Sequence, residues 1–108
     1  MCEIKEKDWK LFRKMIPIWQ ENFMKKLLEK YKEILQKDAL PSEKFWELEK
    51  RINSDKKCAG VYVVRSRSRL FENILNLAAE KAITMEDLEG FSDEIKIPAQ
   101  RVLNNFVD

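Results

Sequence analysis

Alternating arginine and serine side chains form the strongest candidate for chemistry in this sequence, and they are Arg65, Ser66, Arg67, Ser68 and Arg69. The cluster stands at the expected start of a helix, where arginine opposes the helix dipole unless an anion is bound. Serine caps, free backbone N–H groups and guanidinium forks together suit a phosphate group, and an extended backbone would point all three arginines to one side. With Lys56 and Lys57 upstream, the cluster predicts contact with a nucleic-acid backbone or an acidic protein surface. The alternative is a solvated turn.

The charge distribution supports a binding role for this part of the chain. The formal net charge is only +2, but residues 50–69 contain seven basic side chains and one acidic side chain. Residues 70–108 contain three basic and eight acidic side chains. A basic middle and an acidic end make the chain a dipole, which favours electrostatic steering or self-association.

The segment 91–107 resembles a degenerate helix-turn-helix motif of DNA-binding regulators. Apolar and small residues fall where that motif places them, namely at Phe91, Ser92, Ile95, Ile97 and Val102. A second helix beginning at Pro98 would bury Ala99, Val102, Leu103 and Phe106. It would expose side chains of the types that read base edges, namely Gln100, Arg101, Asn104 and Asn105. Lys96 replaces the usual turn glycine, and the local acidity opposes approach to DNA. An ordinary amphipathic helix is the alternative.

Groups that catalysis usually needs are missing from the sequence. There is no histidine, which is the usual general base near neutral pH and the commonest metal ligand. Gly60 and Gly90 are isolated, so no phosphate-binding glycine loop is present. Cys2 and Cys58 have no metal-binding or redox spacing, and two reduced thiols are expected; activation of Cys58 by neighbouring lysines is the alternative. We therefore expect a protein without enzymatic activity, cofactor or metal.

A long helix is predicted over residues 8–37, with Asp8 as its N-cap. Its main apolar residues recur in steps of three and four, as Trp9, Phe12, Ile16, Trp19, Phe23, Leu27, Tyr31 and Ile34. Pro17 removes a backbone N–H, which predicts a kink or a division into two helices.

Additional apolar residues widen this stripe on opposite sides of the proline. They are Leu11, Met15 and Ile18 before it, and Met24, Leu28 and Leu35 after it. Because the apolar stripe rotates around the helix axis across Pro17, a kink at this proline is favoured. The alternative is that Leu11, Met15 and Ile18 form a separate protein interface, such as a homodimer contact.

The next elements also have helical signals. Ser42 is the predicted N-cap of a helix with Phe45, Leu48 and Ile52 on its inner face and Trp46 to one side. A polar loop follows over 53–60, and Val61–Val64 is the one β-like segment, which needs a partner strand or is not a strand.

The remaining chain predicts a central helix from Ser66 or Ser68 to Ala82. A Thr84/Asp87 capping box and short helices over 92–96 and 98–107 complete it. The fold class is therefore all-α, a small bundle of about four to five helices in a single domain over residues 1–108.

The sequence contains no apolar stretch near the ~20 residues that a membrane span needs. Its first residues alternate in charge and contain no apolar signal-peptide core. A soluble cytoplasmic protein without a membrane partner is expected.

Three segments of the sequence together carry a family resemblance: residues 9–21, which contain Trp9, Pro17 and Trp19, residues 42–52, and residues 83–94. They resemble a family of small uncharacterised proteins of clostridial-type bacteria, often carried on mobile elements. The resemblance covers most of the chain and brings no catalytic or ligand residues with it. It implies plasmid or phage housekeeping, or inhibition of a host defence enzyme such as a CRISPR nuclease. The family ends in one continuing helix, from which Ile97-Pro98 departs.

These observations predict a non-enzymatic helical adaptor or inhibitor that acts by protein–protein contact on nucleic-acid-handling machinery. The alternative is a DNA- or RNA-binding regulator that uses the basic segment 50–69 and the helix-turn-helix-like segment 91–107.

Overall fold

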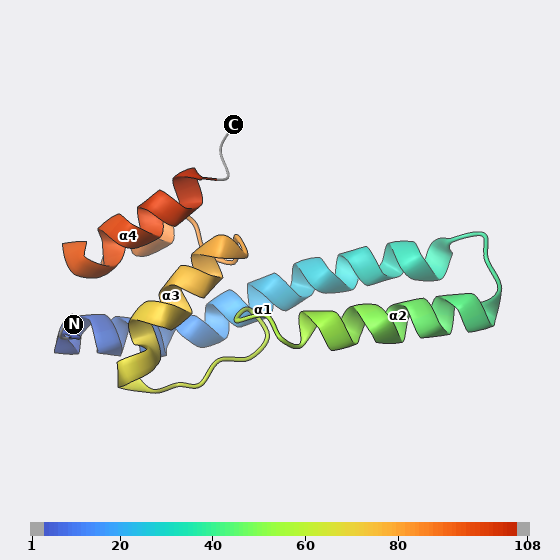
Figure 1. Ribbon diagram of the computed structural model, residues 1–108, viewed down its shortest axis with the longest axis horizontal. Coiled ribbons are helices and arrows are strands. Elements are labelled where there is room, and N and C mark those ends of the chain that lie inside the picture. The colour runs from blue at the N-terminus through green and yellow to red at the C-terminus, as the bar shows by residue number, and fades with distance from the viewer. Residues whose placement is uncertain (1–3, 106–108) are drawn as a thin grey trace.

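The protein is all-α, as predicted, in a computed structural model that describes residues 4–105. Within that range Figure 1 shows four α-helices, which are α1 (Glu6–Gln36), α2 (Pro41–Asp55), α3 (Leu70–Ala79) and α4 (Asp93–Asn104). Two single 3₁₀ turns, η1 (Arg67–Arg69) and η2 (Glu86–Leu88), precede α3 and α4. The predicted Thr84/Asp87 capping box is confirmed at η2, where the Thr84 N–H donates to Asp87 Oδ2 at 2.8 Å and the Asp87 N–H donates to Thr84 Oγ1 at 3.3 Å.

The helix α1 continues through Pro17 without interruption, so the prediction of one long helix is confirmed and a division into two is wrong. Pro17 is exposed, whereas its neighbours Ile16 and Trp19 are buried. The site that lacks a backbone hydrogen bond therefore faces solvent, where water can satisfy the freed carbonyl. In Figure 1 the axis of α1 changes direction between its blue and cyan parts.

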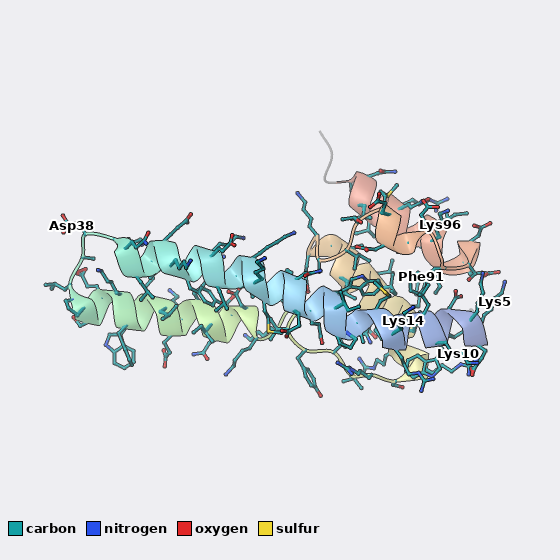
Figure 2. The ribbon with its side chains drawn as sticks, turned by 180° about the vertical axis from the view of Figure 1, so that it is seen from behind. Lys5, Lys10, Lys14, Asp38, Phe91 and Lys96 are labelled. Atoms are coloured by element: carbon teal, nitrogen blue, oxygen red, sulfur yellow. The ribbon has the colours of Figure 1, made fainter. Side chains whose placement is uncertain are left out.

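Two groups of elements divide the molecule into a body and a hairpin. The body contains the first half of α1 with α3 and α4, and its core includes Phe12, Ile16, Leu70, Ile74 and Leu77, all fully buried. Trp19 packs between Phe12 and Phe91, with ring centroids 6.3 and 6.2 Å away. Figure 2 shows Phe91 inside this body.

The hairpin consists of the second half of α1 and the antiparallel α2, and it projects away from the body (Figure 1). Its core is small: Leu27, Tyr31 and Ile34 are buried, and Leu48 packs against them. The projection makes the molecule 52 × 31 × 21 Å, with a radius of gyration of 16.2 Å. A compact domain of this length would have a radius of about 13 Å. The tip of the hairpin, marked by Asp38 in Figure 2, is thus far from the body.

The β-like segment Val61–Val64 is not a strand, and the described part of the chain contains no strand with which it could pair. Val63 is buried in the body core while Tyr62 and Val64 face outward. The Asn73 amide nitrogen donates to the Val64 carbonyl at 3.0 Å, which replaces a strand partner. The alternation of this segment therefore reflects an irregular strap across the core.

Asp8 is not the N-cap of α1, because that helix begins at Glu6 and Asp8 lies within its first turn. Its carboxylate is only 1% exposed and meets the start of α4 instead. The Ser92 N–H donates to Asp8 Oδ1 at 2.9 Å, and the Ser92 hydroxyl donates to Oδ2 at 2.5 Å. A negative charge at a helix amino terminus interacts favourably with the helix dipole. Asp8, predicted to be the N-cap of α1, thus accepts hydrogen bonds at the start of α4 from Ser92, which is 84 positions away in the sequence.

Replacing Asp8 with Ala should lower the free energy of unfolding by about 2 kcal/mol, because two buried donors of Ser92 lose their acceptor. Urea titration followed by circular dichroism measures the change. Lys10→Ala, an exposed change on the same helix, is the matched control and should stay within about 0.5 kcal/mol of the wild type. Equal stability of the two variants would contradict the role given to Asp8.

Candidate functional site

The turn between α1 and α2 is held by contacts that fix the tip of the hairpin. Lys37 Nζ donates to both carboxylate oxygens of Glu47, at 2.8 and 2.7 Å. Lys44 Nζ donates to the Leu35 carbonyl at 2.9 Å. The prediction that Ser42 is the N-cap of α2 is wrong by two residues, because the helix begins at Pro41 and Leu40 is its N-cap.

Pro41 takes the first helical position because its fixed φ suits that position and its missing N–H costs nothing there. The Leu40 N–H donates to Glu43 Oε1 at 3.2 Å, which is half of a capping box. The Leu40 side chain consequently points away from the helix and is 64% exposed.

Three large apolar side chains form an exposed surface near this turn, called here the tip surface: Leu40, Phe45 and Trp46. Phe45 and Trp46 are 63% and 61% exposed, and their rings pack edge to face with centroids 5.0 Å apart. The prediction of Phe45 as an inner-face residue is therefore wrong. The reason is that α2 packs on α1 alone and has no buried residue, so only Leu48 contacts the hairpin core.

A second apolar surface, called here the groove face, runs along one side of the hairpin: Met24, Leu28, Leu35 and Ile52. Leu28 and Leu35 are 61% and 52% exposed. A hollow of about 280 Å³ opens between the helices. Its lining residues are Met24, Leu27, Leu28, Tyr31, Ile52, Asp55, Lys56 and Val61. Both α1 and α2 thus contribute apolar side chains to the same side of the hairpin.

The base of the hairpin is fixed by polar contacts that involve Tyr31. The Tyr31 hydroxyl donates to Asp55 Oδ2 at 2.5 Å, and Arg51 Nε lies 3.3 Å from the same oxygen. Burial, followed by the hydrogen bond to Asp55, raises the pKa of Tyr31 from 10.0 to about 12. This group joins the two helices where they leave the body.

The hairpin is also joined to the body through the backbone at residues 59 and 60. The carboxylate of Glu80, just after α3, accepts the N–H groups of Ala59 and Gly60 at 2.8 and 2.9 Å. Gln20 of α1 donates to the Ala59 carbonyl at 3.0 Å. A Cβ at Gly60 would lie only 2.3 Å from the Phe23 ring, so glycine is required for this close approach.

The arginines predicted to bind phosphate do not form one cluster in the structure. Arg67 donates to Glu6 at 2.8 Å and to the Ile4 carbonyl at 2.7 Å. Arg65 points toward Gln20 Oε1, 3.5 Å away, and Arg69 pairs with Glu72 at 3.4 Å. Residues Arg67–Arg69 form a 3₁₀ turn, so the extended backbone that would point all three arginines to one side is absent there. Glu6 and Gln20, the partners of Arg67 and Arg65, are about 21 Å apart along α1.

The other members of the predicted phosphate site are also placed by the structure. The hydroxyls of Ser66 and Ser68 bond to each other at 3.0 Å. Lys56 and Lys57 are exposed at the end of α2, and Lys57 lines one hollow together with Arg69 and Glu72. The Cys58 thiol is not activated by these lysines: burial, with the carboxylates of Glu80 and Asp55, raises its pKa.

The carboxyl-terminal segment does not form two helices joined by a turn. One helix, α4, runs from Asp93 through Pro98 to Asn104, so the predicted helix start at Pro98 is wrong. Pro98 is the sixth residue of α4, so its missing N–H leaves the Glu94 carbonyl without the usual intrahelical donor, and because Glu94 is exposed, water can satisfy that carbonyl. The predicted base-reading residues Gln100, Arg101, Asn104 and Asn105 lie on this helix or at its end, with Gln100 half-buried and the others exposed. Phe106 lies outside the described residues.

The predicted interface residues Leu11, Met15 and Ile18 divide into two sets. Leu11 and Met15 are half-buried and pack against the body core, and a Cβ at Gly90 would lie 2.8 Å from Leu11. Only Ile18 is exposed, at 50%. The sequence therefore misplaced the spare apolar surface, which lies on the hairpin and not on the first half of α1. The signal for it was the excess of apolar residues on α2 and on the second half of α1, which pack mainly on each other.

Between residues 4 and 105, no three histidine, cysteine or carboxylate side chains gather closely enough to hold a metal ion. In the same range, no helix is long and apolar enough to cross a membrane. The surfaces that stand out by geometry are thus the two apolar faces of the hairpin.

The raised pKa of Tyr31 predicts an additional loss of stability at high pH. Folding favours the neutral phenol, so its contribution is complete below the ordinary pKa of 10.0 and disappears as the pH rises toward about 12. Tyr31→Phe should lack this component and should lose about 1 kcal/mol at neutral pH with the hydrogen bond to Asp55. Urea midpoints at about pH 9 and 11 test it, with Tyr62→Phe as control. Equal alkaline losses in wild type and Tyr31→Phe would disprove the coupling.

No family model matches the chain, and neither a curated protein nor a solved structure shows significant similarity to it.

Proposed function

We propose that this chain is a non-catalytic binding module that docks on another protein through the tip surface of its hairpin. The observation that carries the proposal is the exposure of Leu40, Phe45 and Trp46, each above 60%, within seven consecutive residues. Tryptophan and other aromatic residues are enriched among the anchors that dominate binding energy at protein interfaces. Scattered single apolar residues need no explanation, but the rings of Phe45 and Trp46 are in contact and form a joined exposed patch.

The position of the tip surface supports a role in contact with a separate molecule. The turn lies at the end of an arm that projects from the body, so no other part of the described chain covers it (Figure 1). Phe45 and Trp46 contact each other, which restricts both rings before any partner arrives. Restricted side chains lose less conformational entropy on binding than mobile ones.

The proposal extends to the class of partner, which is a component of nucleic-acid-handling machinery that the protein would bridge or inhibit. Support for this class comes from the basic segment 50–69 and from the resemblance to proteins of mobile elements. In a mobile-element setting, inhibition of a defence enzyme such as a CRISPR nuclease is the specific form of the proposal.

Direct binding of nucleic acid is favoured less by the geometry. The three arginines of segment 65–69 already have polar partners, and two of those partners are carboxylates. Figure 1 also shows this segment and the end of α4 on opposite sides of the first half of α1. One DNA or RNA helix would therefore not contact both predicted surfaces together.

Placing the photo-cross-linking residue p-benzoylphenylalanine at position 46 tests the contact directly. In host cells, irradiation should join it to one protein of discrete mass, because the tip surface is expected to be buried there. The same residue at position 62 is the control, since Tyr62 is equally exposed but lies off the hairpin. Trp46→Ala should weaken capture of that protein at least about tenfold, the effect of losing about 1.4 kcal/mol.

The stability of Trp46→Ala should stay within about 0.5 kcal/mol of the wild type, because the indole contributes little to the core. Two results would refute the tip surface as a docking site. One is identical cross-linking from positions 46 and 62. The other is cross-linking from position 46 to nucleic acid only.

A further inference from the structure

A polar hollow of about 360 Å³, called here the strap hollow, opens between α3 and the strap at residues 61–64. One wall is a polar side of α3 with the residue before and the residue after that helix, and it consists of Arg69, Glu72, Asn73, Asn76 and Glu80. The other wall includes Tyr62 and Val64 of the strap and Lys57 before it. This volume is within the range of small-molecule sites, roughly 300–1,000 Å³.

Asn73 provides a buried hydrogen-bond acceptor in the strap hollow. The residue is only 6% exposed, and its amide nitrogen donates to the Val64 carbonyl at 3.0 Å. Its amide oxygen has no donor among residues 4–105. In that range, the one fully enclosed side-chain nitrogen or oxygen without a partner is Trp19 Nε1, so the Asn73 oxygen is open to the hollow. A ligand that carries a hydrogen-bond donor would satisfy it.

A cation and an anion lie close together at one end of the hollow. The Glu80 carboxylate accepts the N–H groups of Ala59 and Gly60, one on each oxygen, and each oxygen keeps a second lone pair. Lys57 is two residues before Ala59, so their Cα atoms are at most about 7 Å apart. Its ammonium forms no ion pair with a described residue. Opposite charges at this spacing suit the ammonium and the carboxylate of one zwitterionic molecule.

We infer that the strap hollow binds a free α-amino acid with a hydrogen-bonding side chain, such as glutamine. The carboxylate of the ligand pairs with Lys57, and its ammonium pairs with Glu80. Asn76 and Asn73 precede Glu80 by one and two helical turns, about 6 and 11 Å along α3, and this spacing places all three on one side of the helix. A ligand side chain that extends along α3 therefore meets both carboxamides. The carboxamide of glutamine can donate to Asn73 and accept from Asn76.

The charges of the hollow favour a zwitterion over an anion. Its lining contains two cations, Lys57 and Arg69, and two carboxylates, Glu72 and Glu80. Arg69 already lies 3.4 Å from Glu72. A nucleotide phosphate in the same hollow would approach both carboxylates, and like charges in contact oppose association. A free amino acid with a neutral side chain has no net charge to be repelled.

Titration of the nitrogen-15-labelled full chain with L-glutamine, followed by NMR, tests the inference. The dissociation constant should be below about 1 mM. The side-chain amide signals of Asn73 and Asn76 should shift together with the backbone amides of Ala59 and Gly60. Three compounds serve as controls: L-leucine lacks the side-chain donor, N-acetyl-L-glutamine lacks the ammonium, and L-glutaminamide lacks the carboxylate. Each should bind at least about tenfold more weakly than L-glutamine.

Two exposed residues of the hollow can be changed while the contacts of Glu80 and Asn73 stay in place. Lys57→Ala and Asn76→Ala should each weaken the binding of L-glutamine about fivefold, the effect of losing one polar contact. Lys56→Ala is the matched control, because Lys56 is the neighbouring exposed lysine and does not line this hollow. It should bind L-glutamine as the wild type does.

The inference is overturned if these signals do not shift at about 20 mM L-glutamine, far above the expected dissociation constant. Binding of L-leucine or adenosine monophosphate as tight as that of L-glutamine also overturns it, and so do equal affinities of Lys57→Ala and Lys56→Ala. This inference goes beyond the proposed function, because the strap hollow and the tip surface share no residue. Trp46→Ala should therefore keep the wild-type affinity for L-glutamine, and cross-linking from position 46 tests the proposed function alone.

Discussion

The constraint on which this structure depends is that one helix must serve two cores. The buried stripe of α1 contacts the body up to Trp19 and Gln20, and the hairpin from Phe23 onward. Beside that stripe, Leu11 and Met15 find partners in the body. Leu28 and Leu35, on the opposite side, find none in the described chain and stay exposed. The exposed surface of the hairpin is therefore a direct consequence of the rotation of the apolar stripe near Pro17.

Such a helix has to be held at both ends of the body if its outer half is to present a surface in one direction. At the start, the Asp8 carboxylate ties α1 to the first turn of α4. At the junction, Glu80 and Gln20 fix the backbone at residues 59 and 60, and Phe23 packs where only a glycine fits. These buried polar contacts are specific in direction, so they orient the arm as well as stabilising it.

Sequence patterns correctly predicted the features that depend only on residues close together in the chain. The helical period identified α1 and α3, and the Thr84/Asp87 pair identified a short helical turn, because these signals act over three or four positions. Sequence could not assign Asp8 to Ser92, because that pairing spans 84 residues. It could not assign Arg67 to Glu6 for the same reason, so an arginine that supports the fold was interpreted as a ligand contact. It also placed Phe45 inside, since a pattern shows which side is apolar but not whether another element covers it.

Because the hydrophobic core of the hairpin is small, the stability of the two paired helices depends on their other contacts. Leu27, Tyr31 and Ile34 with Leu48 are few side chains to hold two helices together, and isolated helices of such length are marginal in water. Continuity with the body and the bond between Tyr31 and Asp55 stabilise the base, but neither reaches the turn at residues 37–40. Covering the groove face would add apolar burial along the whole arm. The Lys37–Glu47 and Lys44–Leu35 contacts hold the turn itself, and because a partner that binds only the folded arm stabilises it by mass action, binding at the tip surface would also raise the stability of the whole hairpin.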